Sequence, residues 1–125
     1  MSRDYRLFLD DIRESCEKIL RYTQGMAKVQ FEADEKTQDA VVRNLEIIGE
    51  AVKHLPEEVR NRYPQVEWRK IAGLRDVVVH HYFGINKDIV WDIVENKVPQ
   101  LLVQLKQVSF GQDEEAESSG GESGA

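Results

Sequence analysis

Apolar residues recur every three or four positions along most of the chain, which is the spacing of helices that bury one side. The first such stretch runs from about Asp4 to Thr23, where Gly25 ends it and a connecting segment follows through Phe31. A second, longer stretch runs from Asp34, a residue type that caps helices, to about Leu55. Pro56 ends it, because proline cannot continue the backbone hydrogen bonding.

The second half of the chain continues the helical pattern in shorter segments. Residues 57–62 are expected to form a short helical turn that Pro64 stops. A further helix is expected over residues 66–81, and Asn86 can cap a last helix that Pro99 kinks or interrupts. The pattern therefore predicts an all-α fold, an antiparallel bundle of four to five helices.

Charge is distributed unevenly along the 125 residues, whose net charge is −6. Five of the 23 acidic residues lie in residues 111–125, which have no Lys or Arg, so the body carries 18 acidic and 17 basic residues. We expect one helical domain over residues 1–110 and a disordered Gly-, Ser- and Glu-rich tail over 111–125. A docking segment for a basic partner is the alternative interpretation of that tail. Because the body is nearly neutral, RNA would need a local basic cluster, for which Arg43, Arg69 and Lys70 are candidates.

Several kinds of function are disfavoured by features that the sequence lacks. No apolar run approaches the roughly 20 residues that cross a bilayer, so no membrane association is expected. The first residues lack the apolar core of a signal peptide, and the single Cys16 fits a reducing compartment, so we expect a cytoplasmic protein. His54, His80 and His81 form no metal-ligand motif, and no Gly-rich phosphate loop is present, so neither metal nor cofactor is expected.

The stretch from Arg75 to Tyr82 places a guanidinium, a carboxylate, an imidazole and a phenol in an otherwise apolar segment. Arginine suits phosphate, and histidine is the usual carrier of protons near neutral pH. On one helix Asp76 and His80 are four positions apart and can meet, but Arg75 and His80 are about 140° apart. A second copy of the helix across a two-fold axis would let them converge on one phosphate. The alternative is that all of these are ordinary solvated or packed helix residues.

The wider sequence closely resembles the HepT-like family, which belongs to the HEPN group of small helical ribonucleases. The resemblance runs from about residue 31 to 102 and is carried by residues 37–51, 68–76, 79–83 and 89–91. It implies a HEPN-like helical fold and a homodimer.

Members of this family carry an Arg, a polar residue, three further residues and a His, then one residue and a Tyr. This chain matches at Arg75, Asp76, His80 and Tyr82, although Asn is common where Asp76 stands. The resemblance implies metal-independent RNA cleavage by the ribose 2′-hydroxyl, with Arg75 and His80 catalytic and Asp76 orienting His80. Tyr82 could stack on a base or bond to phosphate.

Asn44 and Glu50 belong, in the family pattern, to a helix that lines the same region. They are expected to support the site by orienting Arg75 or a ribose, although each is also an ordinary helix residue.

HepT-like proteins are typically toxins of type VII-like toxin–antitoxin pairs, whose antitoxin is a minimal nucleotidyltransferase. In the family the antitoxin can silence the toxin by transferring AMP to the motif tyrosine, here Tyr82. The resemblance therefore implies three partners: an RNA substrate such as tRNA or mRNA, the nucleotidyltransferase, and a second copy of the chain. Two alternatives stay open: a non-catalytic helical dimer that only binds the nucleotidyltransferase, and a nucleotide-binding transferase, which the missing phosphate loop disfavours.

Overall fold

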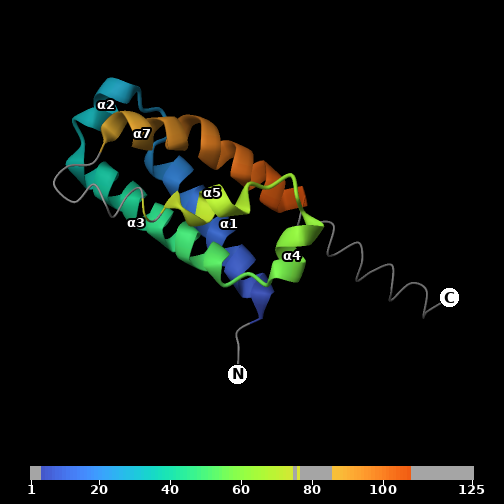
Figure 1. Ribbon diagram of the computed structural model, residues 1–125. Helices are drawn as coiled ribbons and strands as arrows, with labels where there is room; N and C mark the ends of the chain where they lie inside the picture. Colours follow the sequence, from blue (N-terminus) through green and yellow to red (C-terminus); the bar gives the residue numbers. More distant parts are fainter. Residues whose placement is uncertain (1–3, 75, 77–85, 108–125) are drawn as a thin grey trace.

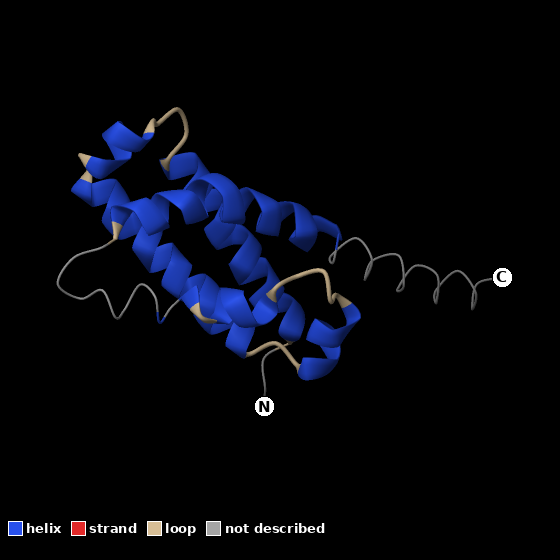
Figure 2. Ribbon diagram, turned by 45° about the horizontal axis from the view of Figure 1, so that its top comes forward, coloured by secondary structure: helices blue, strands red, loops and turns tan. Residues whose placement is uncertain are grey.

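The computed structural model describes residues 4–74, 76 and 86–107. Helices and short loops make up all of this part of the chain, which confirms the all-α prediction (Figures 1 and 2). Residues 98–107 continue the final helix beyond η1. The elements, in chain order, are α1 (Tyr5–Tyr22), α2 (Lys28–Glu32), α3 (Glu35–Lys53), α4 (Glu57–Arg62), α5 (Trp68–Ala72), α7 (Lys87–Asp92) and η1 (Ile93–Lys97).

Helices α1 and α3 are the two longest elements and pack against each other along the bundle (Figure 1). Both begin where the sequence predicts, because the Asp4 and Asp34 carboxylates accept hydrogen bonds from the Arg6 and Thr37 backbone N–H groups at 2.9 and 3.0 Å. Gly25 has a φ of 76°, the left-handed conformation that favours glycine after a helix. The fully buried apolar side chains of the two helices form the centre of the core: Ile12, Cys16, Ile19, Val41, Leu45, Ile48 and Val52.

Helix α2 lies in the segment that the sequence pattern assigned to a connection. It is five residues long, too short to show a helical period, and Phe31 attaches it to the core by a fully buried ring. The Gln38 side chain of α3 holds its end by donating from Nε2 to the carbonyl oxygens of Phe31 and Glu32 at 2.8 and 3.0 Å. The segment predicted as a connection through Phe31 therefore contains a short helix, which is also held by contacts with a distant part of the chain: the Phe31 ring lies 5.3 Å from that of Trp91, and Lys87 donates to the Glu32 carbonyl oxygen at 2.9 Å.

Helix α4 has the predicted bounds, whereas α5 begins two residues later than the predicted helix over 66–81. The backbone N–H of Val66 donates to the Tyr63 carbonyl in a turn, and the Val66 side chain is buried. The Trp68 indole then donates to the carbonyl oxygens of Arg60 and Tyr63 at 3.1 and 3.2 Å, which fixes the start of α5 on the end of α4. The rest of the predicted helix, residues 75 and 77–81, lies outside the described residues.

The last helix is capped by Asn86, as predicted, because its side-chain oxygen accepts from the Ile89 N–H at 3.1 Å. Pro99 does not break the helix. Instead, residues Ile93–Lys97 form a wider π-helical turn, and the helix continues through residues 98–107. Proline has no N–H and its ring crowds the carbonyl one turn earlier, and the wider turn accommodates both effects while Val94 and Val98 stay buried. In the described part of the chain, no helix combines the length and apolar character needed to span a membrane.

Candidate functional site

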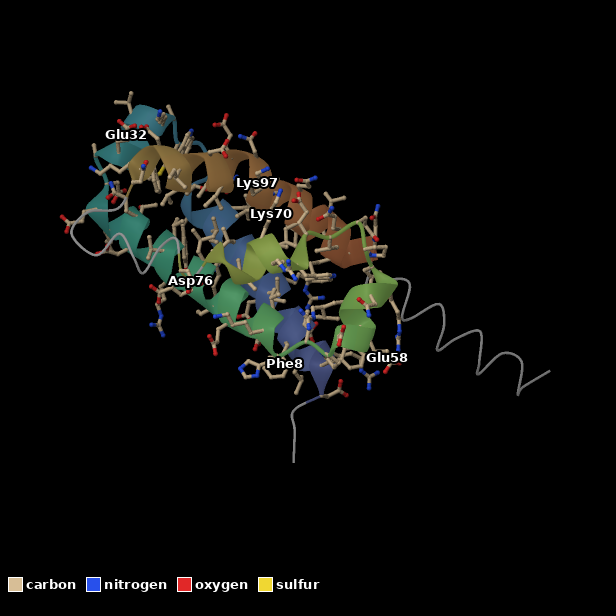
Figure 3. The ribbon with its side chains drawn as sticks, viewed as in Figure 1. Phe8, Glu32, Glu58, Lys70, Asp76 and Lys97 are labelled. Atoms are coloured by element: carbon tan, nitrogen blue, oxygen red, sulfur yellow. The ribbon has the colours of Figure 1, made fainter. Side chains whose placement is uncertain are left out.

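The predicted catalytic residues Arg75 and His80, and the tyrosine Tyr82, lie outside the described residues. Asp76 is described, has helical backbone and is exposed (Figure 3). Its predicted contact with His80 stays a prediction. The surroundings of the motif are therefore built from α3, α5 and the last helix.

Helix α5 leads the chain into the motif. It packs on α3 and runs in the opposite direction (Figure 1). Ile48 of α3 lines a common cavity with Ile71 and Leu74, which places the end of α5 beside the C-terminal half of α3. Asn44, the central residue of α3, lies one turn before Ile48 and on the same face of the helix.

Asn44 is buried, with 6% of its surface exposed, and its amide is only half satisfied. Its Nδ2 donates to the carbonyl oxygen of Ala40, one turn earlier, at 2.8 Å. Its Oδ1 has no hydrogen-bond partner among the described residues. A buried acceptor left unpaired costs about 1–3 kcal/mol, so this oxygen is a candidate for a functional role as a hydrogen-bond acceptor.

Glu50, the second predicted supporting residue, is exposed and lies on a different side of α3. At about 100° per residue, it is roughly 120° away from Asn44 around the helix. One Glu50 oxygen lies 3.5 Å from Nε2 of His54, whose ring stacks on Phe8 with centroids 5.0 Å apart. Within the described residues, Glu50 therefore belongs to the α1–α3 surface rather than to the surroundings of Asn44.

The three predicted RNA-binding residues are all exposed: Arg43 on α3, and Arg69 and Lys70 on α5. The Lys70 ammonium pairs with the Glu67 carboxylate at 2.6 Å. This hydrogen bond raises the pKa of Lys70 and lowers the pKa of Glu67, so both groups stay charged. Lys97 of η1 also lowers the pKa of Glu67 by its charge, and it was missed in the sequence because its position beside α5 arises only from tertiary packing (Figure 3).

A cavity of about 160 Å³ separates α5 from the last helix and opens on one side to solvent. Its walls are aliphatic, and its rim carries charged and amide side chains. The wall residues are Ile48, Ile71, Leu74, Ile93, Val98 and Leu101. The rim residues are Glu67, Lys70, Lys97, Gln100 and Gln104.

Cys16 is buried in the α1–α3 core, and burial raises the pKa of its thiol to about 12. A thiol that stays protonated is a poor nucleophile, so Cys16 serves packing. The described ranges hold no group of three His, Cys, Asp or Glu side chains placed to bind a metal ion.

Comparison with known proteins identifies the class to which this helical domain belongs. Residues 12–108 match the family described as "Ribonuclease HepT-like". The chain belongs to this family, which confirms the resemblance carried by its motifs, and ribonuclease, the expected enzyme class, is the class of the family.

Two archaeal proteins and one bacterial protein illustrate the relationship. The chain is 50% identical over 117 residues to "Putative RNase MJ0127" of Methanocaldococcus jannaschii, covering 94% of this chain and 97% of that protein. It is 41% identical to "Putative RNase TTE0752" of Caldanaerobacter subterraneus, covering 82% and 92% of the two chains. It is 40% identical to "Probable ribonuclease HepT" of Thermococcus cleftensis, covering 81% and 92%. No solved structure shows significant similarity to the chain.

Proposed function

We propose that this protein is a metal-independent endoribonuclease and the toxin of a toxin–antitoxin pair. The observation that carries the proposal is the family match over residues 12–108, which includes Arg75, Asp76, His80 and Tyr82 at the family's motif spacing. A cytoplasmic RNA, such as a tRNA or an mRNA, is the substrate.

The proposed reaction uses the ribose 2′-hydroxyl as nucleophile. His80 removes the proton of that hydroxyl, and the 2′-oxygen forms a bond to phosphorus while the bond from phosphorus to the 5′-oxygen breaks. His80 of a second copy of the chain donates a proton to the departing 5′-oxygen. Arg75 stabilises the negative charge that develops on the phosphoryl oxygens. The products are a 2′,3′-cyclic phosphate and a 5′-hydroxyl end.

We propose that a homodimer completes this site, because on one ideal helix the spacing of Arg75 and His80 in the sequence would put them about 140° apart. Asp76 orients the His80 imidazole. The Asn44 oxygen, which has no partner among the described residues, supports a positioning role, since it offers a buried acceptor to Arg75 or to a ribose hydroxyl one turn from Ile48 in the cavity wall.

Other described residues support RNA binding less directly. Arg43, Arg69 and Lys70 are exposed and are proposed to contact phosphates. Glu50 keeps its proposed supporting role only as part of a surface completed by the second copy, since it lies away from Asn44 on α3.

Regulation is proposed to act on the same site. A minimal nucleotidyltransferase antitoxin transfers AMP to the hydroxyl of Tyr82, and the added phosphates occupy the anion site near Arg75 and repel RNA. Mass spectrometry of the protein after incubation with ATP and the antitoxin should find the added mass on Tyr82. Neutralised toxicity with an unmodified Tyr82 would contradict this step.

The nuclease itself is tested with purified protein and total cellular RNA in the presence of a chelator. We expect cleavage with 2′,3′-cyclic phosphate ends, lost in His80→Ala and in Arg75→Ala. His81→Ala is the matched control, because it removes the adjacent imidazole and should leave cleavage unchanged. Cleavage that His80→Ala leaves intact, or that stops when the chelator is added, would rule out this mechanism.

A non-catalytic helical dimer that only holds the nucleotidyltransferase is the second candidate. It is favoured by the near-neutral body of the chain and by Asp76, where Asn is common in the family. Growth after induction without the antitoxin separates the two. Arrest that depends on His80 supports the nuclease, whereas unimpaired growth supports the binding module.

The domain boundary remains part of this proposal. We propose that residues 1–110 form the catalytic domain and that the acidic residues 111–125 are a disordered tail dispensable for cleavage. A chain truncated after residue 110 should keep the melting temperature and the cleavage rate of the full chain.

A further inference from the structure

The cavity between α5 and the last helix has the size of a site for one planar ring. Its volume is about 160 Å³, and its walls are aliphatic side chains such as Ile71, Leu74 and Leu101. An apolar cavity of about 150 Å³ in another protein stays dry and admits a benzene molecule. The cavity here is therefore large enough for one six-membered ring and offers that ring apolar faces on both sides.

The rim of the cavity supplies groups that an apolar ligand alone would not need. Lys70 of α5 and Lys97 of η1 both lie on this rim (Figure 3). The Glu67 carboxylate is also on the rim, and both ammonium groups lower its pKa. Glu67 pairs with Lys70 at 2.6 Å, which leaves Lys97 as the surplus positive charge of this rim. A ligand that fits is a flat ring with a negative charge attached beside it.

Two amide side chains give the rim a way to recognise the edge of that ring. Gln104 donates from Nε2 to the Gln65 carbonyl oxygen at 3.1 Å, which fixes the amide and leaves its oxygen as an acceptor. Gln100 is exposed on the turn before it and offers both a donor and an acceptor. Ring edges with both donors and acceptors are a property of nucleobases.

We propose that this cavity binds one pyrimidine base of a single-stranded RNA substrate, with the neighbouring phosphate held by Lys97. Bases removed from a stack are held in this way, by apolar side chains on their faces and hydrogen bonds to their edges. The inference rests on the proposed nuclease function for its substrate class. It adds a subsite close to the reaction, because Leu74 in the cavity wall immediately precedes Arg75 in the sequence.

A second copy of the chain is a less suitable occupant. Stable protein interfaces take about 800 Å² from each partner, whereas this cavity holds a single ring and has three charged side chains on its rim. Charged groups at the centre of a protein–protein contact are disfavoured, but they are expected where phosphate binds.

The test measures binding separately from cleavage. Short 2′-O-methylated oligocytidine and oligouridine lack the nucleophile, so they report binding alone, by fluorescence anisotropy. Their affinity is compared with that of 2′-O-methylated oligoadenosine and of an abasic phosphodiester of the same length. We expect the pyrimidine oligomers to bind about tenfold more tightly than the abasic chain, because their bases bury apolar surface in the cavity, and more tightly than oligoadenosine.

Two variants separate the base from the phosphate. Ile71→Trp fills the cavity and should abolish the preference for pyrimidine over abasic chains while leaving the affinity for the abasic chain unchanged. Lys97→Gln should weaken every oligomer to a similar degree and reduce the slope of log K against log salt by about 0.7. Lys36→Gln is the matched control, since this exposed lysine lies twelve residues before Ile48 on α3, about 18 Å along the helix axis.

Equal affinity of the wild-type protein for pyrimidine and abasic chains would overturn the proposal. So would an Ile71→Trp variant that keeps the wild-type preference, or one whose main change is a shift in oligomeric state, since the latter would assign the cavity to a second copy. Base-dependent binding by a protein that cuts no RNA would leave the subsite standing and remove the nuclease. RNA cleavage by a protein whose binding does not depend on the base would support the nuclease and rule out the subsite.

Discussion

Asn44 allows the clearest test of whether the candidate site stores an unsatisfied group. Replacing Asn44 with Leu keeps the approximate shape and removes the Oδ1 atom that has no partner among the described residues. Removing that buried acceptor should recover about 1–3 kcal/mol. The substitution also loses the hydrogen bond from Nδ2 to the Ala40 carbonyl, which is worth about 0.5–1.5 kcal/mol.

The Ala40 carbonyl stays bonded in Asn44→Leu, because it still accepts the backbone N–H of residue 44 within α3. The expected balance is a gain of about 1 kcal/mol in the free energy of unfolding, which corresponds to a rise of about 4 °C in Tm for a domain of this size. RNA cleavage should fall at the same time, because the acceptor proposed to position Arg75 or a ribose hydroxyl is gone.

Gln38 provides a matched control on the same helix, since it is also a buried amide but a satisfied one. Its Nε2 donates to two carbonyl oxygens, so Gln38→Met should lower the free energy of unfolding by about 1–2 kcal/mol. Thermal and urea unfolding, followed by circular dichroism, gives the free energy of unfolding of each variant, and a cleavage assay gives its activity on RNA. An Asn44→Leu variant that is less stable than wild type, or that cleaves RNA at the wild-type rate, would refute the reasoning.

Three further predictions concern the scaffold. Cys16, whose pKa burial raises to about 12, should resist alkylation in the folded protein at pH 8 and react only on unfolding; rapid reaction of the native chain would contradict its burial. Trp68→Phe removes an indole that donates to two backbone carbonyls, so urea unfolding should report a loss of about 1–2 kcal/mol, and a neutral variant would show that these contacts contribute little. Hydrogen bonds from Thr37 lower the pKa of Asp34 in the folded protein. The charged carboxylate therefore stabilises the fold above the pKa of Asp34 in the unfolded chain, about 3.9, and this stability is lost as the pH falls through the lower pKa of the folded protein. Asp34→Asn keeps a cap that does not titrate, so acid titration should show a smaller loss of stability than in wild type.

The long helices were predictable because their signals are local. A capping carboxylate, a regular apolar period and a terminating Gly or Pro all lie within each segment, as Asp34 and Pro56 show for α3. Helix α2 was not predictable in this way. Five residues carry no period, and the burial of Phe31 against Trp91 becomes visible only when distant segments meet.

Pro99 illustrates a second limit of local rules. Its missing N–H predicts that regular helical bonding fails near this point, and it does fail. The rule does not say how the helix responds. Val94 within the π-helical turn and Val98 directly after it are both buried, so the helix responds with one wider turn and continues with both side chains in the core.

The candidate site depends both on local sequence signals and on tertiary packing, and only the residues with local signals could be found from the sequence. Asn44 and Lys70 carry signals within their own helices, but the proximity of Lys70 to Lys97 depends on how α5 packs against the last helix. The unpaired oxygen of Asn44 and the cavity wall at Ile48 lie one turn, or about 6 Å, apart on the same face of α3. An RNA strand with one base in the proposed cavity would therefore pass within about one helical turn of Asn44, so Ile71→Trp and Asn44→Leu test neighbouring parts of one proposed surface.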